Sequence, residues 1–325
     1  MIKSLALQAE MSAEFGACVF DVTLDCEDGS AIGDEKNHAN LVVALVNKAR
    51  AATVNVATYK AARVAVRVHP VGHPAFEQDV DIIVGGAAAG LCHVMIPKVE
   101  TRADVDRAVQ RVDQAAAQSG RCDPLPLHVL LESSVGVQHA FEIAAHPRVQ
   151  SLSFGLMDFV SSHGGAIPAS AMGVDAAPGW HGLDQFNHPL VRRAKLEISA
   201  ACHAHGKVPS HCVVTEFRDV ALLQSAARQA ARAFGFTRMW SIHPAQIRPI
   251  LQAFVPEAQE IEMAANIMRA GGQAHWAPIS FGGKLHDRAS YRYFWQVLQR
   301  AHQTGCRLPA AAEVYFSDVV AKQCH

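Results

Sequence analysis

The chain has 325 residues, of which 50% are hydrophobic and 18% are charged, and its formal net charge is −1. This composition predicts a large core and excludes the basic surface of a nucleic-acid-binding protein. No apolar run reaches the roughly 18 residues of a membrane span, the first residues are too polar for a secretory signal, and the scattered cysteines form no paired framework. We therefore expect a cytoplasmic protein with reduced thiols and a small-molecule partner.

Short apolar, β-branched stretches alternate along the chain with alanine-rich helical stretches. Apolar strands separated by helices are typical of a parallel sheet that is covered on its outer face. The strands predicted from this pattern are 17–25, 63–68, 91–97, 125–132, 149–156, 207–214 and 238–244. The helices predicted between and after them are 41–52, 102–118, 136–145, 188–205 and 217–234.

This alternation suits either an open doubly wound sheet or a (β/α)₈ TIM barrel. No glycine-rich dinucleotide fingerprint follows a strand, whereas polar residues follow several strands, as they do at the active-site end of a barrel. We therefore predict an α/β protein with a (β/α)₈ barrel. The pattern supplies seven strands where a barrel has about eight, and residues 2–7 are the candidate for the missing one.

Two regions interrupt the alternation. The segment 161–187 is rich in Gly, Ala and Pro and is too long for an ordinary connection, which favours a lid or a binding loop. From about residue 256 the chain begins a further helix and then leaves the pattern of the barrel. We therefore predict a catalytic barrel at 1–255 and a C-terminal helical segment or lid at 256–325, able to cover its own site or that of a neighbouring subunit.

Two carboxylates follow predicted strands directly. Glu132 ends HVLLE and Asp158 ends SFGLMD, so neighbouring strands would carry both side chains to the same rim of a barrel. Two adjacent anions repel unless a proton or a cation lies between them. An all-oxygen site suits Mg²⁺ or Mn²⁺. The alternative is that each acid caps the helix that follows it.

The stretch VTLDCEDG ends an apolar strand in three acids and a glycine, and the next strand carries Arg67. A buried arginine needs a partner, which can be a substrate oxygen or an acid of the preceding strand. We expect Glu27 and Asp28 to face Arg67 and the cation and to orient water, and Asp25 to be buried structural polarity. Gly29 would permit the tight exit from the strand.

Lys98, in MIPKVE, is expected at the same rim. A Schiff-base lysine requires a lowered pKa in a dry pocket. Several acids nearby would keep this amine protonated, so an ion pair is the better interpretation.

Five stretches in this order resemble the HpcH/HpaI aldolase/citrate lyase family, in particular its citrate-lyase-beta-subunit-like and malyl-CoA-lyase-like branch. They are LDCEDGSAIGDEK, VAVRVH, VMIPKVET, LLESSVGVQHAFEIAAHPRVQSLSFGLMDF and WSIHPAQIRPI. The resemblance extends over residues 17–300 and implies a (β/α)₈ barrel with Mg²⁺ held by Glu132 and Asp158. It also implies that Arg67 binds a 2-oxo acid and that Glu132 contacts the substrate as well as the metal.

The resemblance further implies that Asp287 reaches the site of a neighbouring subunit in a homotrimer or homohexamer. The chain departs from the family at its start, where KSLALQAEM stands in place of a strand and a VPG turn that helps to hold coenzyme A. The segment 161–187 also lacks the family's more regular loop, which could alter the choice of substrate.

The function that these residues imply is a Mg²⁺-dependent carbon–carbon lyase of retro-aldol or Claisen type, acting on a β-hydroxy acid or its CoA thioester. Arg67 would stabilise developing negative charge on oxygen. Asp287 would be the acid/base, with water positioned by Glu27 or Asp28 as the alternative. The other possibilities are a class II aldolase for pyruvate-type donors without CoA, a related thioesterase or malate-synthase-like activity, and a non-catalytic citrate-lyase-like subunit.

Overall fold

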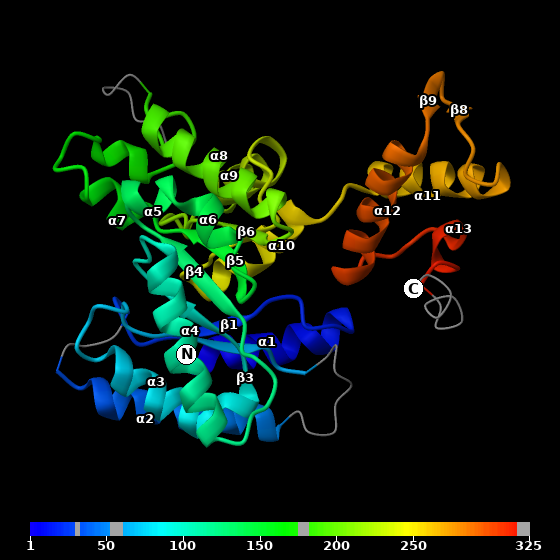
Figure 1. Cartoon of the computed structure of the whole chain (residues 1–325). Helices are drawn as coiled ribbons and strands as arrows, with labels where there is room; N and C mark the ends of the chain where they lie inside the picture. The colour runs from blue at the N-terminus through cyan, green and yellow to red at the C-terminus, as the bar shows by residue number, and fades with distance from the viewer. Residues whose placement is uncertain (30–32, 53–60, 175–181, 317–325) are drawn as a thin grey trace. The chain divides into compact units, whose positions relative to one another are not determined.

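The computed structural model of the chain describes residues 1–29, 33–52, 61–174 and 182–316 (Figure 1). These residues form two compact units. The first unit comprises Met1–Glu10 and Phe20–Phe254, and it contains the parallel sheet. The second comprises Met11–Val19 and the described part of Val255–His325. The predicted division into a catalytic barrel and a C-terminal lid stays a prediction.

The sheet of the first unit has seven parallel strands that lie side by side in the order of the sequence. They are β1 (Val22–Asp25), β2 (Val64–Arg67), β3 (Leu91–Ile96), β4 (Leu127–Leu131), β5 (Val149–Phe154), β6 (Val208–His211) and β7 (Arg238–Met239). Each strand lies within a predicted one and is shorter than it at one or both ends. Sequential parallel strands with helical connections are the arrangement of a TIM barrel, so the predicted α/β barrel class is confirmed.

Ion pairs join the two ends of this sheet. Asp21, which directly precedes β1, accepts hydrogen bonds from Arg238 of β7 at 2.9 Å and from Arg63, just before β2, at 2.5 Å. Burial alone would raise the pKa of Asp21, but the two guanidinium groups outweigh it and hold this pKa below its usual value. The first and last strands are therefore linked at their N-terminal ends, as the closure of a curled sheet requires.

Helices follow the strands and cover the outer face of the sheet (Figure 1). They are α2 (Glu35–Ala51), α3 (Phe76–Ala87), α4 (Arg102–Gln118), α5 (Ser134–Gln138), α6 (Ala140–Ala144), α7 (Leu156–Ser161), α8 (Pro189–Ala204), α9 (Val220–Ala233) and α10 (Ile247–Phe254). The sequence pattern had not indicated α3, α7 or α10. The helix predicted at 136–145 is two short helices that meet at His139.

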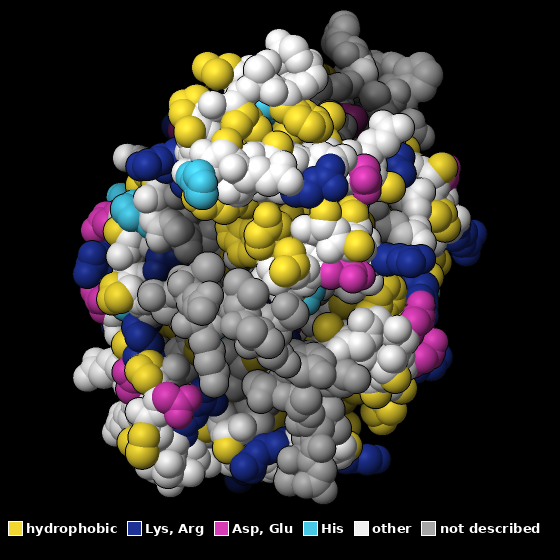
Figure 2. All heavy atoms as spheres, turned by 90° about the vertical axis from the view of Figure 1, so that its right-hand side faces the viewer, with side chains coloured by type: hydrophobic (Ala, Val, Ile, Leu, Met, Phe, Trp, Pro, Cys, Tyr) yellow, Lys and Arg dark blue, Asp and Glu magenta, His cyan; other side chains and the backbone are white. Residues whose placement is uncertain are grey.

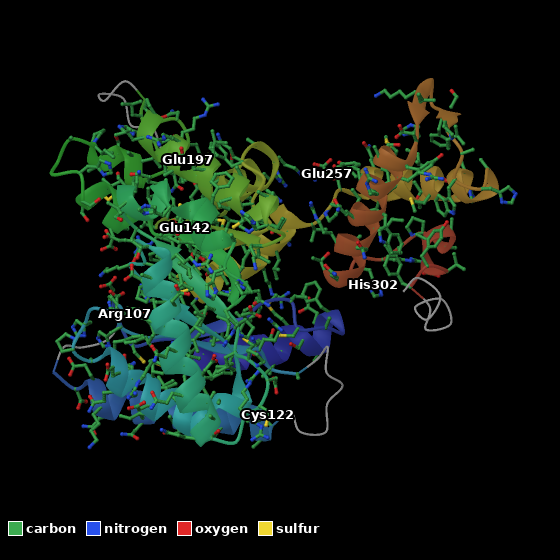
Figure 3. The ribbon with its side chains drawn as sticks, viewed as in Figure 1. Arg107, Cys122, Glu142, Glu197, Glu257 and His302 are labelled. Atoms are coloured by element: carbon green, nitrogen blue, oxygen red, sulfur yellow. The ribbon has the colours of Figure 1, made fainter. Side chains whose placement is uncertain are left out.

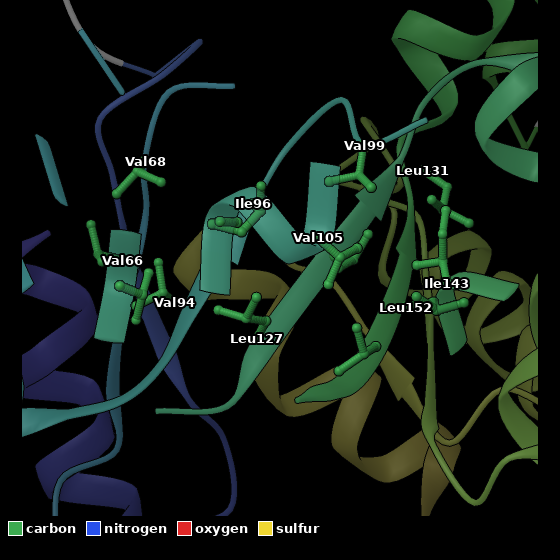
Figure 4. Packing of buried hydrophobic residues seen from close by; sticks show 14 of the residues in the cluster. Val66, Val68, Val94, Ile96, Val99, Val105, Leu127, Leu131, Ile143 and Leu152 are labelled. Carbon is green, nitrogen blue, oxygen red and sulfur yellow. The ribbon is translucent and has the colours of Figure 1, made fainter. Parts of the chain in front are cut away.

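The main core lies between the strands and these helices (Figure 4). Its strand residues are buried and come mostly from alternate positions, for example Leu127, Val129 and Leu131 of β4. Ile143 of α6 packs in the same cluster. Each such side chain contributes about 1.5–3 kcal/mol on burial, so the outer face of the sheet is the main source of stability in this unit.

Residues 2–7 are not a strand, and the prediction made for them is wrong. They begin the helix α1 (Ile2–Phe15). Its buried positions Gln8, Met11 and Ser12 are three and four residues apart, which is helical spacing, and Ile2 is exposed. The Gln8 side chain donates hydrogen bonds to the carbonyls of Phe20 and Arg63 and so ties the helix to the N-terminal ends of the strands.

The second unit contains a hairpin as well as helices. Its elements are α11 (Ala258–Gln273), β8 (Ile279–Phe281), β9 (Lys284–His286), α12 (Arg288–Gln303) and α13 (Ala310–Glu313). Gly282 and Gly283 connect β8 to β9 with φ values of +57° and +74°, which glycine adopts without steric cost. Glu257, labelled in Figure 3, forms a capping box with Glu260 at the start of α11.

The surface agrees with the near-neutral composition. On the face drawn in Figure 2, basic and acidic side chains are mixed with hydrophobic ones. None of the helices in the described ranges is long and apolar enough to cross a membrane. None of the seven cysteines in these ranges takes part in a disulfide.

Candidate active site

Charged residues that end or follow the strands lie at one edge of the sheet. Asp25 and Arg67 end β1 and β2, and Lys98 follows β3 by two residues. Glu132 directly follows β4, and Asp158 lies in the first turn of α7 after β5. Parallel strands end at the same edge, so chain order alone brings these five side chains to one rim.

Arg67 is held in place by an acid of the preceding strand. Its Nε and Nη2 donate to the two carboxylate oxygens of Asp25 at 2.7 and 2.6 Å. Nη1 forms an ion pair with Glu27 at 2.9 Å, and the guanidinium carbon lies 5.5 Å from the centre of the Trp240 ring. Burial opposes ionisation of Asp25, but Arg67 outweighs it and lowers the pKa of this carboxyl. Asp25 is thus a direct ion-pair partner of Arg67, whereas the sequence pattern had predicted only a structural role for it.

Glu27 and Asp28 contact both cations of the rim. Lys98 Nζ donates to Glu27 at 2.6 Å and lies 3.7 Å from Asp28. Burial and the adjacent Glu27 raise the pKa of Asp28. The pKa of Lys98 is raised despite partial burial, because Glu27 and the other acids stabilise the ammonium form. This favours the predicted ion pair and disfavours Schiff-base chemistry.

Glu132 is nearly buried, with 5% of its surface exposed. Its Oε2 accepts a hydrogen bond of 2.8 Å from the backbone N–H of Lys98. Burial, reinforced by the negative charge of Asp158, raises the pKa of Glu132 to about 8. The negative charge of Asp158 thus opposes the ionisation of Glu132.

Neither acid is the cap of its helix, which was the alternative interpretation. The cap of α5 is Ser133, whose side chain accepts a hydrogen bond from the backbone N–H of Gly136. The residue before α7 is Gly155, which offers no side chain for capping. Asp158 lies inside the helix, and its carboxylate, 40% exposed, is 3.7 Å from Lys98 Nζ.

The charge at the rim fits a divalent cation. Five carboxylates face the two cationic side chains of Arg67 and Lys98, and they are those of Asp25, Glu27, Asp28, Glu132 and Asp158. Glu132 and Asp158, whose negative charges repel each other, offer only oxygen atoms as ligands, and Mg²⁺ prefers oxygen ligands. A bound Mg²⁺ would relieve the repulsion that raises the pKa of Glu132.

Three residues of the rim were missed or undervalued by the sequence interpretation. A side chain at Gly155 would overlap that of Glu132, and one at Gly29 would overlap the Asp25 carboxylate. Trp240, directly after β7, faces the arginine. Glycines next to strand-end acids are the signal that could have indicated the first two.

Asp287 is placed in the second unit. Its carboxylate caps α12 by accepting hydrogen bonds from the backbone N–H groups of Ala289 and Ser290. Its role at a neighbouring subunit's site stays a prediction. Of the predicted loop 161–187, residues 175–181 lie outside the described ranges.

A second cluster has side chains of the metal-binding types but does not suit a cation. Asp21, Cys92 and His93 lie together at the N-terminal ends of the strands. Both oxygens of Asp21 are already occupied by Arg63 and Arg238. Burial raises the pKa of the Cys92 thiol to about 12, so the neutral thiol is favoured. A metal ion would meet two guanidinium groups here.

Comparison with known proteins identifies the family. The model of HpcH/HpaI aldolase/citrate lyase matches residues 4–244. L-malyl-CoA/beta-methylmalyl-CoA lyase of Cereibacter sphaeroides is 30% identical over 294 residues, 86% of each chain. The crystal structure of a citrate lyase from Burkholderia xenovorans LB400 is 45% identical, with a TM-score of 0.80 over 97% of this chain and 92% of that one. The citrate lyase beta subunit of M. tuberculosis, complexed with oxaloacetate and magnesium, is 26% identical, with a TM-score of 0.53 over 77% of this chain and 94% of that one.

Proposed function

We propose, because the chain belongs to the HpcH/HpaI aldolase/citrate lyase family, that it is a Mg²⁺-dependent carbon–carbon lyase. Its substrate would be a β-hydroxy acid or the CoA thioester of one, and a 2-oxo acid would be the fragment bound at the rim. The observation that carries the proposal is that Glu132 and Asp158 both contact Lys98. Lys98 and Arg67 in turn both contact Glu27, so two acids and two cations are gathered at the rim, which is the charge distribution that such a reaction needs.

Glu132 and Asp158 would hold the Mg²⁺ ion, which would supply a Lewis acid for the carbonyl oxygen of the 2-oxo acid. Holding the ion requires both carboxyl groups to be ionised. The raised pKa of Glu132 means that this residue gives up a proton when the cation enters.

Arg67 would bind the carboxylate or carbonyl oxygen of the substrate. A guanidinium group has five N–H donors, and Asp25 and Glu27 together engage only part of them. The N–H groups that remain on Nη1 and Nη2 can donate to a substrate oxygen. Because Asp25 fixes the plane of the guanidinium, this donor pair would be oriented before the substrate arrives, and preorganised charge is the main source of stabilisation for an oxyanion.

Proton transfer would fall to an acid at the edge of the site. Asp28 is the most exposed of the rim carboxylates, and burial together with Glu27 raises its pKa. A group of this kind can accept a proton from a substrate hydroxyl or from a water molecule and return it later. Asp287 of a neighbouring subunit, in the trimer or hexamer implied by the family, is the other candidate for this role.

The proposal is tested by offering the purified protein glyoxylate and Mg²⁺ with acetyl-CoA, propionyl-CoA or pyruvate, and measuring condensation by mass spectrometry. Product from a thioester would support the CoA-dependent lyase. Product from pyruvate alone would identify the class II aldolase instead. Hydrolysis of the thioester product to a free acid would indicate the thioesterase or malate-synthase-like activity, and no turnover with any pair would favour the non-catalytic subunit.

A further inference from the structure

Lys98 contacts the two proposed metal ligands through two different groups. Its backbone N–H donates to Glu132 Oε2 at 2.8 Å. Its Nζ lies 3.7 Å from Asp158 Oδ1, on the other proposed ligand. Lys98 therefore contacts both of the carboxylates that the proposed function assigns to the metal.

The backbone of Lys98 is in a conformation that disfavours a side chain. Its φ is +53°, in the left-handed region, where a non-glycine residue costs about 1–3 kcal/mol. Glycine would adopt this conformation without steric cost and would offer the same backbone N–H to Glu132. The hydrogen bond to Glu132 therefore explains the conformation of the backbone, and the presence of the long side chain needs another reason.

The ammonium group supplies that reason. It is hydrogen-bonded to Glu27 at 2.6 Å and lies 3.7 Å from both Asp28 and Asp158, so it stands among three carboxylates from two different parts of the rim. Arg67 contacts Asp25, Glu27 and Asp28, which leaves the side of the rim at Asp158 to the lysine. The charge of Lys98 is thus placed between Asp158 and the acids that Arg67 also contacts.

We propose that Lys98 is a positioning residue whose ammonium group acts as the resident counter-ion of the metal-free site and is displaced from Asp158 when a divalent cation binds. In the metal-free protein it would hold Asp158 towards Glu27 and Asp28. When the cation binds, the ammonium group would keep its bond to Glu27. The inference rests on the proposed function to the extent that the rim binds Mg²⁺.

A cation that competes with the metal weakens metal binding, so removing the Lys98 ammonium group should increase the affinity for Mg²⁺. Loss of a merely structural residue would leave this affinity unchanged or lower it. Removing one positive charge a few ångströms from a Mg²⁺ site should tighten Mg²⁺ binding by about tenfold or more. The same change leaves the acids of the metal-free protein with less compensation, so its melting temperature should fall. Added Mg²⁺ should then raise the melting temperature of the variant more than that of the wild type.

The test is titration calorimetry of Mg²⁺ into metal-free protein, with thermal unfolding in parallel, for wild type, Lys98→Met, Lys98→Gly and Lys98→Arg. Methionine keeps the length of the side chain without its charge. Glycine removes the side chain and adopts the positive φ without strain, so Lys98→Gly should fold even if Lys98→Met folds poorly. Arginine keeps the charge. We expect tighter Mg²⁺ binding in the methionine and glycine variants, and near-wild-type affinity in the arginine variant.

Unchanged or weaker Mg²⁺ binding in both Lys98→Met and Lys98→Gly would overturn the inference while leaving the metal site intact. Absence of Mg²⁺ binding in the wild type would instead refute the metal site of the proposed function. The two failures are therefore distinguishable in one set of titrations, without any measurement of turnover.

Discussion

Gly155 leaves no room for a side chain against Glu132. A Cβ atom at this position would lie 2.8 Å from the carboxyl carbon of Glu132 and closer still to its Cγ. The φ of Gly155 is −93°, which any residue can adopt, so the glycine is required by space and not by backbone conformation. The position and orientation of the proposed metal ligand thus depend on the absence of a side chain directly after the neighbouring strand β5.

Gly155→Ala should displace Glu132 from the backbone N–H of Lys98. We expect Mg²⁺ affinity to fall by about 10- to 100-fold, the range observed when the support of a metal ligand is lost. Calorimetric titration with Mg²⁺ measures the effect. Gly85→Ala, on a helix position where a Cβ meets open space, is the matched control and should bind Mg²⁺ normally. Equal affinity in the two variants would contradict the assigned role of Gly155.

Glu132→Gln should abolish metal-dependent activity while the protein stays folded. The amide lacks the charge that would bind the cation. It also replaces a buried ionisable group with a neutral one, so the stability of the fold should not decrease. We expect at least about a 100-fold loss of Mg²⁺ affinity, measured by calorimetry, with circular dichroism to verify folding. Wild-type affinity in this variant would show that Glu132 is not a ligand.

Mg²⁺ binding should strengthen as the pH rises towards 8. Burial and Asp158 raise the pKa of Glu132 to about 8, so below this pH the metal-free carboxyl carries a proton that the cation must displace. Affinity should rise by up to about tenfold per pH unit below 8 and level off above it. Calorimetry in buffers of different ionisation enthalpy should detect the released proton near pH 7. An affinity that does not change between pH 6 and pH 9 would refute this linkage.

Arg67→Lys should keep the positive charge but lose the paired contacts with Asp25. A lysine offers no planar fork, so both the orientation of the cation and the donors for the substrate would be lost. We expect kcat/KM to fall by about 100- to 1000-fold, measured by steady-state kinetics. Arg63→Lys is the control, since Arg63 contacts Asp21 at the N-terminal ends of the strands. A comparable loss in both variants would indicate a general effect on the barrel.

Asp287→Asn should impair turnover far more than Mg²⁺ binding, if Asp287 is the acid/base of a neighbouring subunit's site. Asp287 also caps α12, but asparagine has a side-chain oxygen that can accept the same backbone hydrogen bonds, so the helix should lose little stability. Asp219→Asn, at the cap of α9, controls for this. Kinetics, calorimetry and thermal unfolding of both variants separate the two roles. Equal losses of turnover and Mg²⁺ affinity in Asp287→Asn would contradict the assignment.

The sequence by itself determined the barrel class and the rim on which the acids lie. Apolar strands that alternate with helices can bury their faces in few ways, and parallel strands end at the same edge. A polar residue at the end of each strand, such as Arg67 or Glu132, therefore has its place fixed by local spacing. The prediction for the segment 2–7 failed because a short, largely apolar stretch fits a strand and a helix equally well, and packing decided for the helix.

Only the tertiary structure decided which of these side chains touch. The bonds from Arg67 to Asp25, from Lys98 to Glu27 and from Arg238 to Asp21 join residues 42, 71 and 217 positions apart. Such contacts depend on the register of neighbouring strands and on the closure of the sheet, which no local pattern encodes. For the same reason, the double contact of Lys98 and the space left by Gly155 became visible only when β3, β4 and β5 were placed side by side.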